Sequence, residues 1–151
     1  MTDKIGRGEM LLLAVSRLHR LQIEELQDLE HPLTLRQYRI LQRIGEGYAS
    51  LSELSKLSHR SLPSTSESVD GLIRRKLLTR SISIVDRRAV ALRLTTLGAH
   101  VLDAGTACLD KIAEDFFGTL SPSKQAALEA LSVRMYRYSG ELMEWESVDG
   151  H

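Results

Sequence analysis

The spacing of apolar residues predicts long helices at both ends of the chain and shorter ones between them. From about residue 8 to residue 30, leucines and a valine recur every three or four positions, which is the repeat of one helix face. Pro32 interrupts this pattern, because the residue before a proline avoids helical backbone angles. Thr34 and Gln37 have capping-box spacing, so a second helix is expected from Thr34 to the glycine-rich segment 45–47.

The middle of the chain predicts two short helices joined by a polar turn. Ser50 and Glu53 form another capping-box pair, and the segment SHRSLP follows the short helix that they begin. The next helix has two candidate caps: Ser61, or Ser64 with Glu67 three positions later. Both alternatives predict a helix with one apolar side that ends near residue 76.

From residue 77 the hydrophobic period changes from 3.6 to 2. The segments LLTRSISIV and AVALRLT alternate between apolar and polar residues, which predicts two strands of a hairpin. An isolated hairpin is not stable in water, so it must pack on the helices. Asp86, Arg87 and Arg88 stand at the predicted tip, where Gly, Asn or Pro is usual. Three charges at this point indicate contact with a partner.

The last third of the chain predicts two more long helices. The first begins at Thr95 or Thr96 and carries apolar residues spaced by threes and fours, and Ser121 with Pro122 begins the second. The final helix has alternating steps of three and four between its apolar residues, as in a coiled-coil seam: Leu128, Leu131, Met135, Tyr138, Leu142 and Trp145. We interpret this stripe, together with the first helix, as a dimer interface; the alternative is the core of a single domain.

Length and charge narrow the class of protein. A chain of 151 residues fits one domain, and no apolar run reaches the roughly 18 residues that span a bilayer. No secretory signal is evident, and one cysteine cannot form an intrachain disulfide, so a cytoplasmic location is expected. The net charge is zero, yet residues 50–95 hold nine basic and four acidic side chains, a local excess of +5. A basic centre suits a polyanionic partner.

The sequence gives little support to an enzyme. The five histidines are scattered without metal-ligand spacing, and GEGYAS lacks the lysine of a phosphate-binding loop. Cys108 lies in an apolar stripe, where it is expected to belong to the core. We therefore predict no catalytic residue, no metal and no cofactor.

Helix, turn, helix and charged hairpin together make a winged helix-turn-helix, and the residues resemble the MarR family of bacterial transcriptional regulators. The resemblance runs through LTLRQYRILQRI, LSELSKL, LPSTSESVDGLIRRKLL and LGAHVL, and its most specific part is DRRAVALRLT. The fold class expected is mainly α with a small β-hairpin wing. The resemblance implies a DNA-binding lobe at 33–95 and a helical dimerisation region at 1–32 and 96–151.

The family resemblance also implies a function and a set of site residues. We expect a homodimeric repressor that binds a pseudo-palindromic duplex, with Asp86 orienting Arg88 into a minor groove that attracts arginine. The helix after the turn should enter the major groove by its N-terminal residues. The DNA-binding candidates are Arg60, Pro63, Ser64, Thr65, Ser68, Arg74, Arg75, Arg87 and Arg88.

Two further expectations follow from the resemblance. An aromatic or phenolic effector is expected between the dimer helices and the DNA lobe, with His19, Arg36 and Tyr38 as candidates. Lys76 replaces the glycine that often ends the recognition helix, so a positive φ angle is expected at a non-glycine residue. Glu67 stands near the predicted DNA surface, and it keeps open an alternative: a winged-helix dimer that binds a protein and does not read DNA sequence.

Overall fold

The computed structural model describes residues 6–82 and 90–142 of the chain. Within these residues it contains six helices and one two-stranded antiparallel sheet. Their bounds are α1 Arg7–Gln27, α2 Leu35–Gly45, α3 Leu51–Ser58, α4 Leu62–Arg74, β1 Leu78–Ile82, β2 Val90–Leu94, α5 Thr96–Phe117 and α6 Pro122–Leu142. The expected fold class, mainly α with a small β-hairpin, is confirmed.

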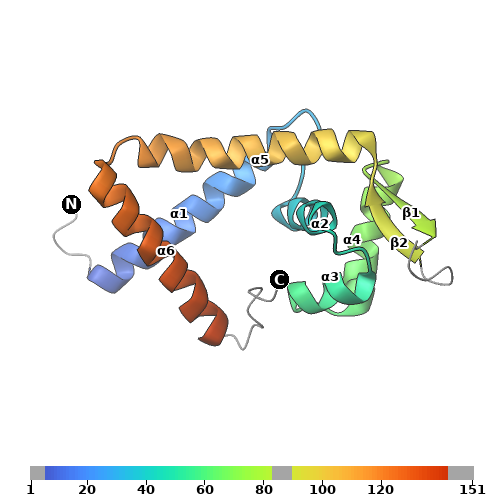
Figure 1. Cartoon of the computed structure of the whole chain (residues 1–151), viewed down its shortest axis with the longest axis horizontal. Coiled ribbons are helices and arrows are strands. Elements are labelled where there is room, and N and C mark those ends of the chain that lie inside the picture. Colours follow the sequence, from blue (N-terminus) through green and yellow to red (C-terminus); the bar gives the residue numbers. More distant parts are fainter. Residues whose placement is uncertain (1–5, 83–89, 143–151) are drawn as a thin grey trace.

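The molecule is elongated, with α5 running along its length (Figure 1). At one end of α5 lie α2, α3, α4 and the hairpin, which we call the lobe (residues 33–95). Away from the lobe, α1 and α6 form what we call the arms, whose ribbons cross in this view. The N-terminal part of α5 contacts the lobe through α2 and β2, and α5 also contacts α1.

Local capping explains where the helices of the lobe begin. The Thr34 hydroxyl accepts the Gln37 amide N–H at 3.1 Å, while the Gln37 side chain accepts the Thr34 amide at 3.0 Å. Ser50 and Glu53 form the same reciprocal pair at α3, so both predicted capping boxes are confirmed. For α4 the cap is Ser61, with Pro in the first turn, and the alternative cap at Ser64 is wrong.

Two helices of the lobe end on left-handed residues that are not glycine. His59 follows α3 with φ 49°, and Lys76 follows α4 with φ 58°. The expectation for Lys76 is therefore confirmed. A left-handed backbone is unfavourable for a residue with a Cβ atom, and it is tolerated where the surrounding structure fixes the turn. Here the Lys76 N–H donates to Ile73 and the Leu77 N–H donates to Leu72.

The hydrophobic core is centred in the lobe, includes Leu26 of α1 and Val101 of α5, and is continuous from the helices to the hairpin. Strand β1 pairs with β2 in the register Leu78 to Leu94 through Ile82 to Val90. Leu92 is buried, and its N–H donates to the Ala49 carbonyl at 2.8 Å, which ties the hairpin to the segment before α3. The fully enclosed aliphatic side chains are Leu26, Leu33, Leu41, Leu54, Val69, Leu72, Leu77, Leu78 and Val101.

Two glycines allow α5 to approach the lobe closely. A Cβ atom on Gly98 would lie 1.9 Å from the Leu77 carbonyl oxygen, so no residue other than glycine fits at this position. A Cβ atom on Gly105 would lie 3.0 Å from the ring of Tyr38. Thr95 caps α5 by accepting the Gly98 N–H, and its hydroxyl donates to the Lys76 carbonyl at 2.6 Å. The start of α5 and the start of β1 therefore form one closely packed junction.

The arms, in contrast, leave their apolar side chains uncovered. Leu12 is 71% exposed on α1, and Leu131 and Tyr138 are 56% and 61% exposed on α6. Leu26 is the only buried residue of α1. The predicted seam residue Trp145 lies outside the described residues. In the described part of the chain, no helix is both long and apolar enough to cross a membrane.

Candidate nucleic-acid interface

The first turn of α4 follows the turn of the helix-turn-helix directly. Ser61 accepts the Ser64 N–H at 3.4 Å, and Pro63 is exposed in the first turn. Pro63 lacks a backbone N–H, which would have no helical partner at this position. Ser64 is half-buried, and its hydroxyl and carbonyl oxygens both accept hydrogen bonds from Arg36 of α2. Arg36 therefore fixes the start of α4 against α2.

The two other hydroxyl candidates bond within their own helix. Thr65 is 1% exposed, and its hydroxyl donates to the Ser61 carbonyl at 3.1 Å. Thr65 faces the interior, so the prediction that it contacts DNA does not fit its placement. Ser68 is half-buried and donates to the Ser64 carbonyl at 3.2 Å. Glu67 is exposed on the same helix.

The basic candidates of the lobe differ in what they contact. Arg60 is exposed in the turn, and Arg74 is exposed in the last turn of α4. Arg75 is half-buried at the end of α4. Its guanidinium donates to the Pro32 carbonyl at 2.7 Å and to the Gln37 side chain at 3.2 Å, which joins the end of α4 to the start of α2.

The hairpin is attached to α4 by an ion pair that the sequence alone did not suggest. Arg80 of β1 lies 2.6 Å from the carboxylate of Asp70 on α4, and both side chains are partly exposed. Arg80 shares the face of β1 that carries Leu78 and pairs with Leu92 of β2, so a charged residue interrupts the apolar face, and that interruption was the available signal. The predicted tip residues Asp86, Arg87 and Arg88 lie outside the described residues.

The three effector candidates contact different elements. Tyr38 is buried, and its hydroxyl shares a hydrogen bond of 3.2 Å with Thr106 of α5. Arg36 binds Ser64 of α4, and His19 is exposed on α1. Tyr38 and Arg36 therefore have structural contacts, and the described contacts do not join the three residues into one site.

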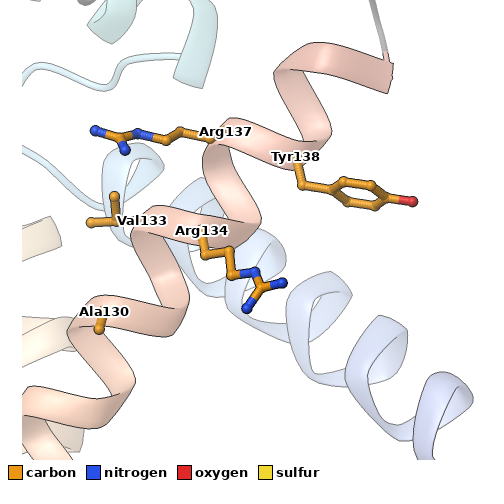
Figure 2. Close-up of a pocket in the computed structure, with 5 residues that line it drawn as sticks. All are labelled: Ala130, Val133, Arg134, Arg137 and Tyr138. Carbon is orange, nitrogen blue, oxygen red and sulfur yellow. The ribbon is translucent and has the colours of Figure 1, made fainter.

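A hollow of about 410 Å³ lies along α6. The described residues that line it all belong to this one helix, and in Figure 2 Arg137 and Tyr138 project in different directions. A ligand site is normally enclosed by several elements that converge on it. We therefore interpret this hollow as part of the uncovered surface of the arms.

Among the described residues, two ionisable side chains have shifted pKa values, and neither shift indicates catalysis. A hydrogen bond from the Ser50 hydroxyl lowers the pKa of Glu53, and the amides of Ser50 and Ala49 act in the same direction. This is the electrostatic effect of a capping box. Burial raises the pKa of the Cys108 thiol, which disfavours the reactive thiolate. In the described ranges, no cluster of His, Cys, Asp or Glu could hold a metal ion.

These elements define a winged helix-turn-helix protein with two additional helical arms. The sequence model of the MarR family matches residues 33–90, which cover nearly the whole lobe. The resemblance of this chain to the MarR family is thereby confirmed. That family consists of transcription regulators, which fits the prediction that the chain is not an enzyme. A comparison with curated proteins found no match.

Solved structures of MarR-type proteins share the fold along most of the chain. FabT of Streptococcus pneumoniae, solved in complex with DNA, has a TM-score of 0.79 at 20% identity, covering 89% of this chain and 96% of FabT. MepR, a regulator of the Staphylococcus aureus multidrug efflux pump MepA, has a TM-score of 0.73 at 18% identity over 89% and 98%. Apo MarR from E. coli has a TM-score of 0.67 at 23% identity over 88% and 98%.

Proposed function

We propose that the chain is a DNA-binding transcriptional repressor that acts as a homodimer in the bacterial cytoplasm. The observation that carries the proposal is the pairing of α4 with the hairpin through Asp70 and Arg80 at 2.6 Å. This contact holds a major-groove helix and a minor-groove wing side by side. A winged helix needs both elements in fixed relation, because they contact adjacent grooves of one duplex. The DNA complex of FabT supports the same use of the fold.

The DNA surface we propose differs from the one expected from sequence. It comprises the turn and first turn of α4, with Arg60, Pro63 and Ser64, together with Arg74 as a phosphate contact and the wing residues Arg87 and Arg88. Ser68 stays at its edge, because its hydroxyl already bonds within the helix. Thr65 and Arg75 are left out, because they support the structure of the lobe. Asp86 is retained as the residue that orients Arg88.

The uncovered arms support the homodimer. Apolar residues on α1 and α6 are exposed along both helices, and such contiguous surfaces mark interaction sites. A two-fold dimer would present two lobes to half-sites about one helical turn, or roughly 34 Å, apart. Release by a small aromatic or phenolic effector would require that the ligand bind one spacing of the lobes more tightly than the other.

The test is a titration of the intact protein against duplex DNA selected from a random pool. Under this proposal, the affinity falls as salt rises, with a slope near −0.9 for each phosphate contact. Light scattering of the same sample should give the mass of a dimer. A chain that selects no duplex at low salt contradicts the proposal.

The second candidate function is a dimeric adaptor that binds a protein through the lobe. The exposed carboxylate of Glu67 on α4 favours it, because an acidic side chain repels a phosphate backbone. The salt titration separates the two functions. An adaptor shows little duplex affinity at any salt concentration, and Glu67→Gln does not raise it.

A further inference from the structure

Three arginines of α2 line a small crevice between α2, α3 and α4. Arg36, Arg39 and Arg43 stand three and four residues apart, so they share one face of the helix. The crevice has a volume of about 40 Å³. Among the described residues that line it none is acidic, the others being Ile40, Leu54, Ser58 and Thr65. The site is therefore positively charged without an internal counterion.

The hydrogen bonds in the described part of the chain engage one nitrogen of each arginine. Arg36 uses Nη2 for both bonds to Ser64, at 2.8 Å and 3.0 Å. Arg39 uses Nη1 for the Gln42 side chain at 2.9 Å, and Arg43 uses Nη2 for the Leu57 carbonyl at a long 3.4 Å. A guanidinium has five N–H donors on three nitrogens. Each arginine thus has donors beyond those that hold it in place.

The size of the crevice limits which acceptor groups can bind to those donors. A water molecule needs roughly 10–15 Å³ of such space, so 40 Å³ admits a group of a few heavy atoms. Buried Ile40 and Leu54 supply apolar walls beside the cations. Carboxylate and phosphate oxygens match the planar fork of arginine and form its strongest hydrogen bonds.

We propose that this crevice binds a small oxyanion, the carboxylate or phosphate group of a small organic molecule. Arg39 and Arg43 hold the anion from one face of α2, and Arg36 joins them when it turns from Ser64. The site lies within one lobe, so it is separate from the crevice between lobe and arms that was expected for an aromatic effector.

Arg36 gives this site a regulatory consequence that rests on the proposed function. Its bonds to Ser64 fix the third residue of α4, the helix that we propose to enter the major groove. An anion that attracts Arg36 competes with those bonds and loosens the start of α4. Coupling of this kind is reciprocal, so the anion weakens DNA binding by the same factor by which DNA weakens anion binding.

Calorimetry of the intact protein without DNA tests the site itself. Inorganic phosphate and butyrate serve as the two probes, at an ionic strength held constant with chloride. At least one probe should bind saturably, and the double variant Arg39→Gln with Arg43→Gln should weaken that binding at least tenfold. The matched control Arg93→Gln removes an exposed arginine elsewhere in the lobe and should change the affinity less than twofold.

Saturable binding of neither probe, or equal binding by the double variant and the parent, overturns the proposal. Arg39 is exposed, so Arg39→Gln alone leaves the core intact and gives an independent reading, an expected loss of at least threefold. A comparison of phosphate with butyrate identifies which oxyanion the site prefers.

Fluorescence anisotropy of a labelled selected duplex then tests the coupling. At constant ionic strength the bound probe should weaken DNA binding by at least threefold in the parent, and by less than 1.5-fold in the double variant. Anion binding that leaves the DNA affinity unchanged overturns the regulatory part. If the protein binds no duplex even without a probe, the proposed function is rejected. The calorimetric test of the crevice does not depend on that outcome.

Discussion

The lobe and the arms use the same kinds of apolar residue in opposite ways. In the lobe, leucines from three helices and a hairpin surround one another, and Leu41 and Leu72 have no exposed surface. In the arms, helices of 21 residues carry comparable side chains that stay largely exposed, such as Leu12 and Leu131. The lobe therefore completes its core within one chain, and the arms do not. The difference shows that amphipathic periodicity predicts a helix face but not what covers it.

A pair of identical substitutions in the two regions should give the largest contrast. Leu41→Ala opens a cavity in the closed core and should lower the free energy of unfolding by about 2–5 kcal/mol. Leu131→Ala removes an exposed side chain and should leave the unfolding of an isolated chain nearly unchanged, while it weakens self-association. Denaturant unfolding at several protein concentrations measures both effects, because the stability of a dimer depends on concentration. Equal losses for the two variants at low concentration would contradict the distinction.

The next effect concerns DNA binding. Arg88→Ala should weaken binding to a selected duplex at least about tenfold, because a specific arginine contact contributes about 1–3 kcal/mol. The thermal midpoint should stay nearly constant. Anisotropy and thermal unfolding of the same preparations provide the two readings, with Arg93→Ala as a matched control on the exposed side of β2. Parent-like affinity in Arg88→Ala would reject the wing as a DNA contact.

A smaller effect is expected at the start of α4. Ser61→Ala removes the side chain that accepts the Ser64 N–H and should lower the stability of the lobe by about 0.5–2 kcal/mol. Ser66→Ala, farther along the same helix, is the control. Hydrogen exchange of the amides of α4 measures the change locally. Protection that is the same in both variants would show that Ser61 does not determine where the helix begins.

The smallest effect on stability belongs to the ion pair between α4 and the hairpin. Asp70→Asn should cost about 0–1 kcal/mol, since both partners are partly exposed to solvent. The effect of Asp70→Asn on DNA binding should be larger than its effect on stability, because the ion pair holds the hairpin in a fixed position relative to α4. Arg80→Gln should reproduce the result, and the double variant should be no worse than either single variant. Additive losses in the double variant would show that the two charges act separately.

Much of the lobe was predictable because local rules determine it. Reciprocal capping at Thr34 and Ser50, the change of period after residue 76 and the positive φ of Lys76 all follow from short stretches of sequence. The direction of a hydroxyl or a guanidinium depends instead on which helix packs beside it. Thr65 lies four residues before Val69, so it shares the buried face of α4, and that spacing was a signal that the prediction did not use.

The arginines show the same limit more clearly. Arg36 and Arg75 both join α2 to α4, across 28 and 38 positions of the chain. No local pattern distinguishes such a residue from one that faces solvent, because the pairing exists only once α2 and α4 lie side by side. The same limit applies to Tyr38, which was expected to bind an effector. Its hydrogen-bond partner Thr106 lies on α5, far away in the sequence.

The junction between Gly98 and Leu77 determines how motion of the arms would reach the lobe. A side chain has no room there, so the first turn of α5 lies against the backbone of Leu77, the residue before the first strand. Helix α5 has 22 residues in all, a length of about 33 Å at 1.5 Å per residue. A tilt of about 10° over that length displaces the far end by about 6 Å. A small rotation of α5 about the Gly98–Leu77 contact, which only a residue without a Cβ atom allows, would therefore move the arms by several ångströms.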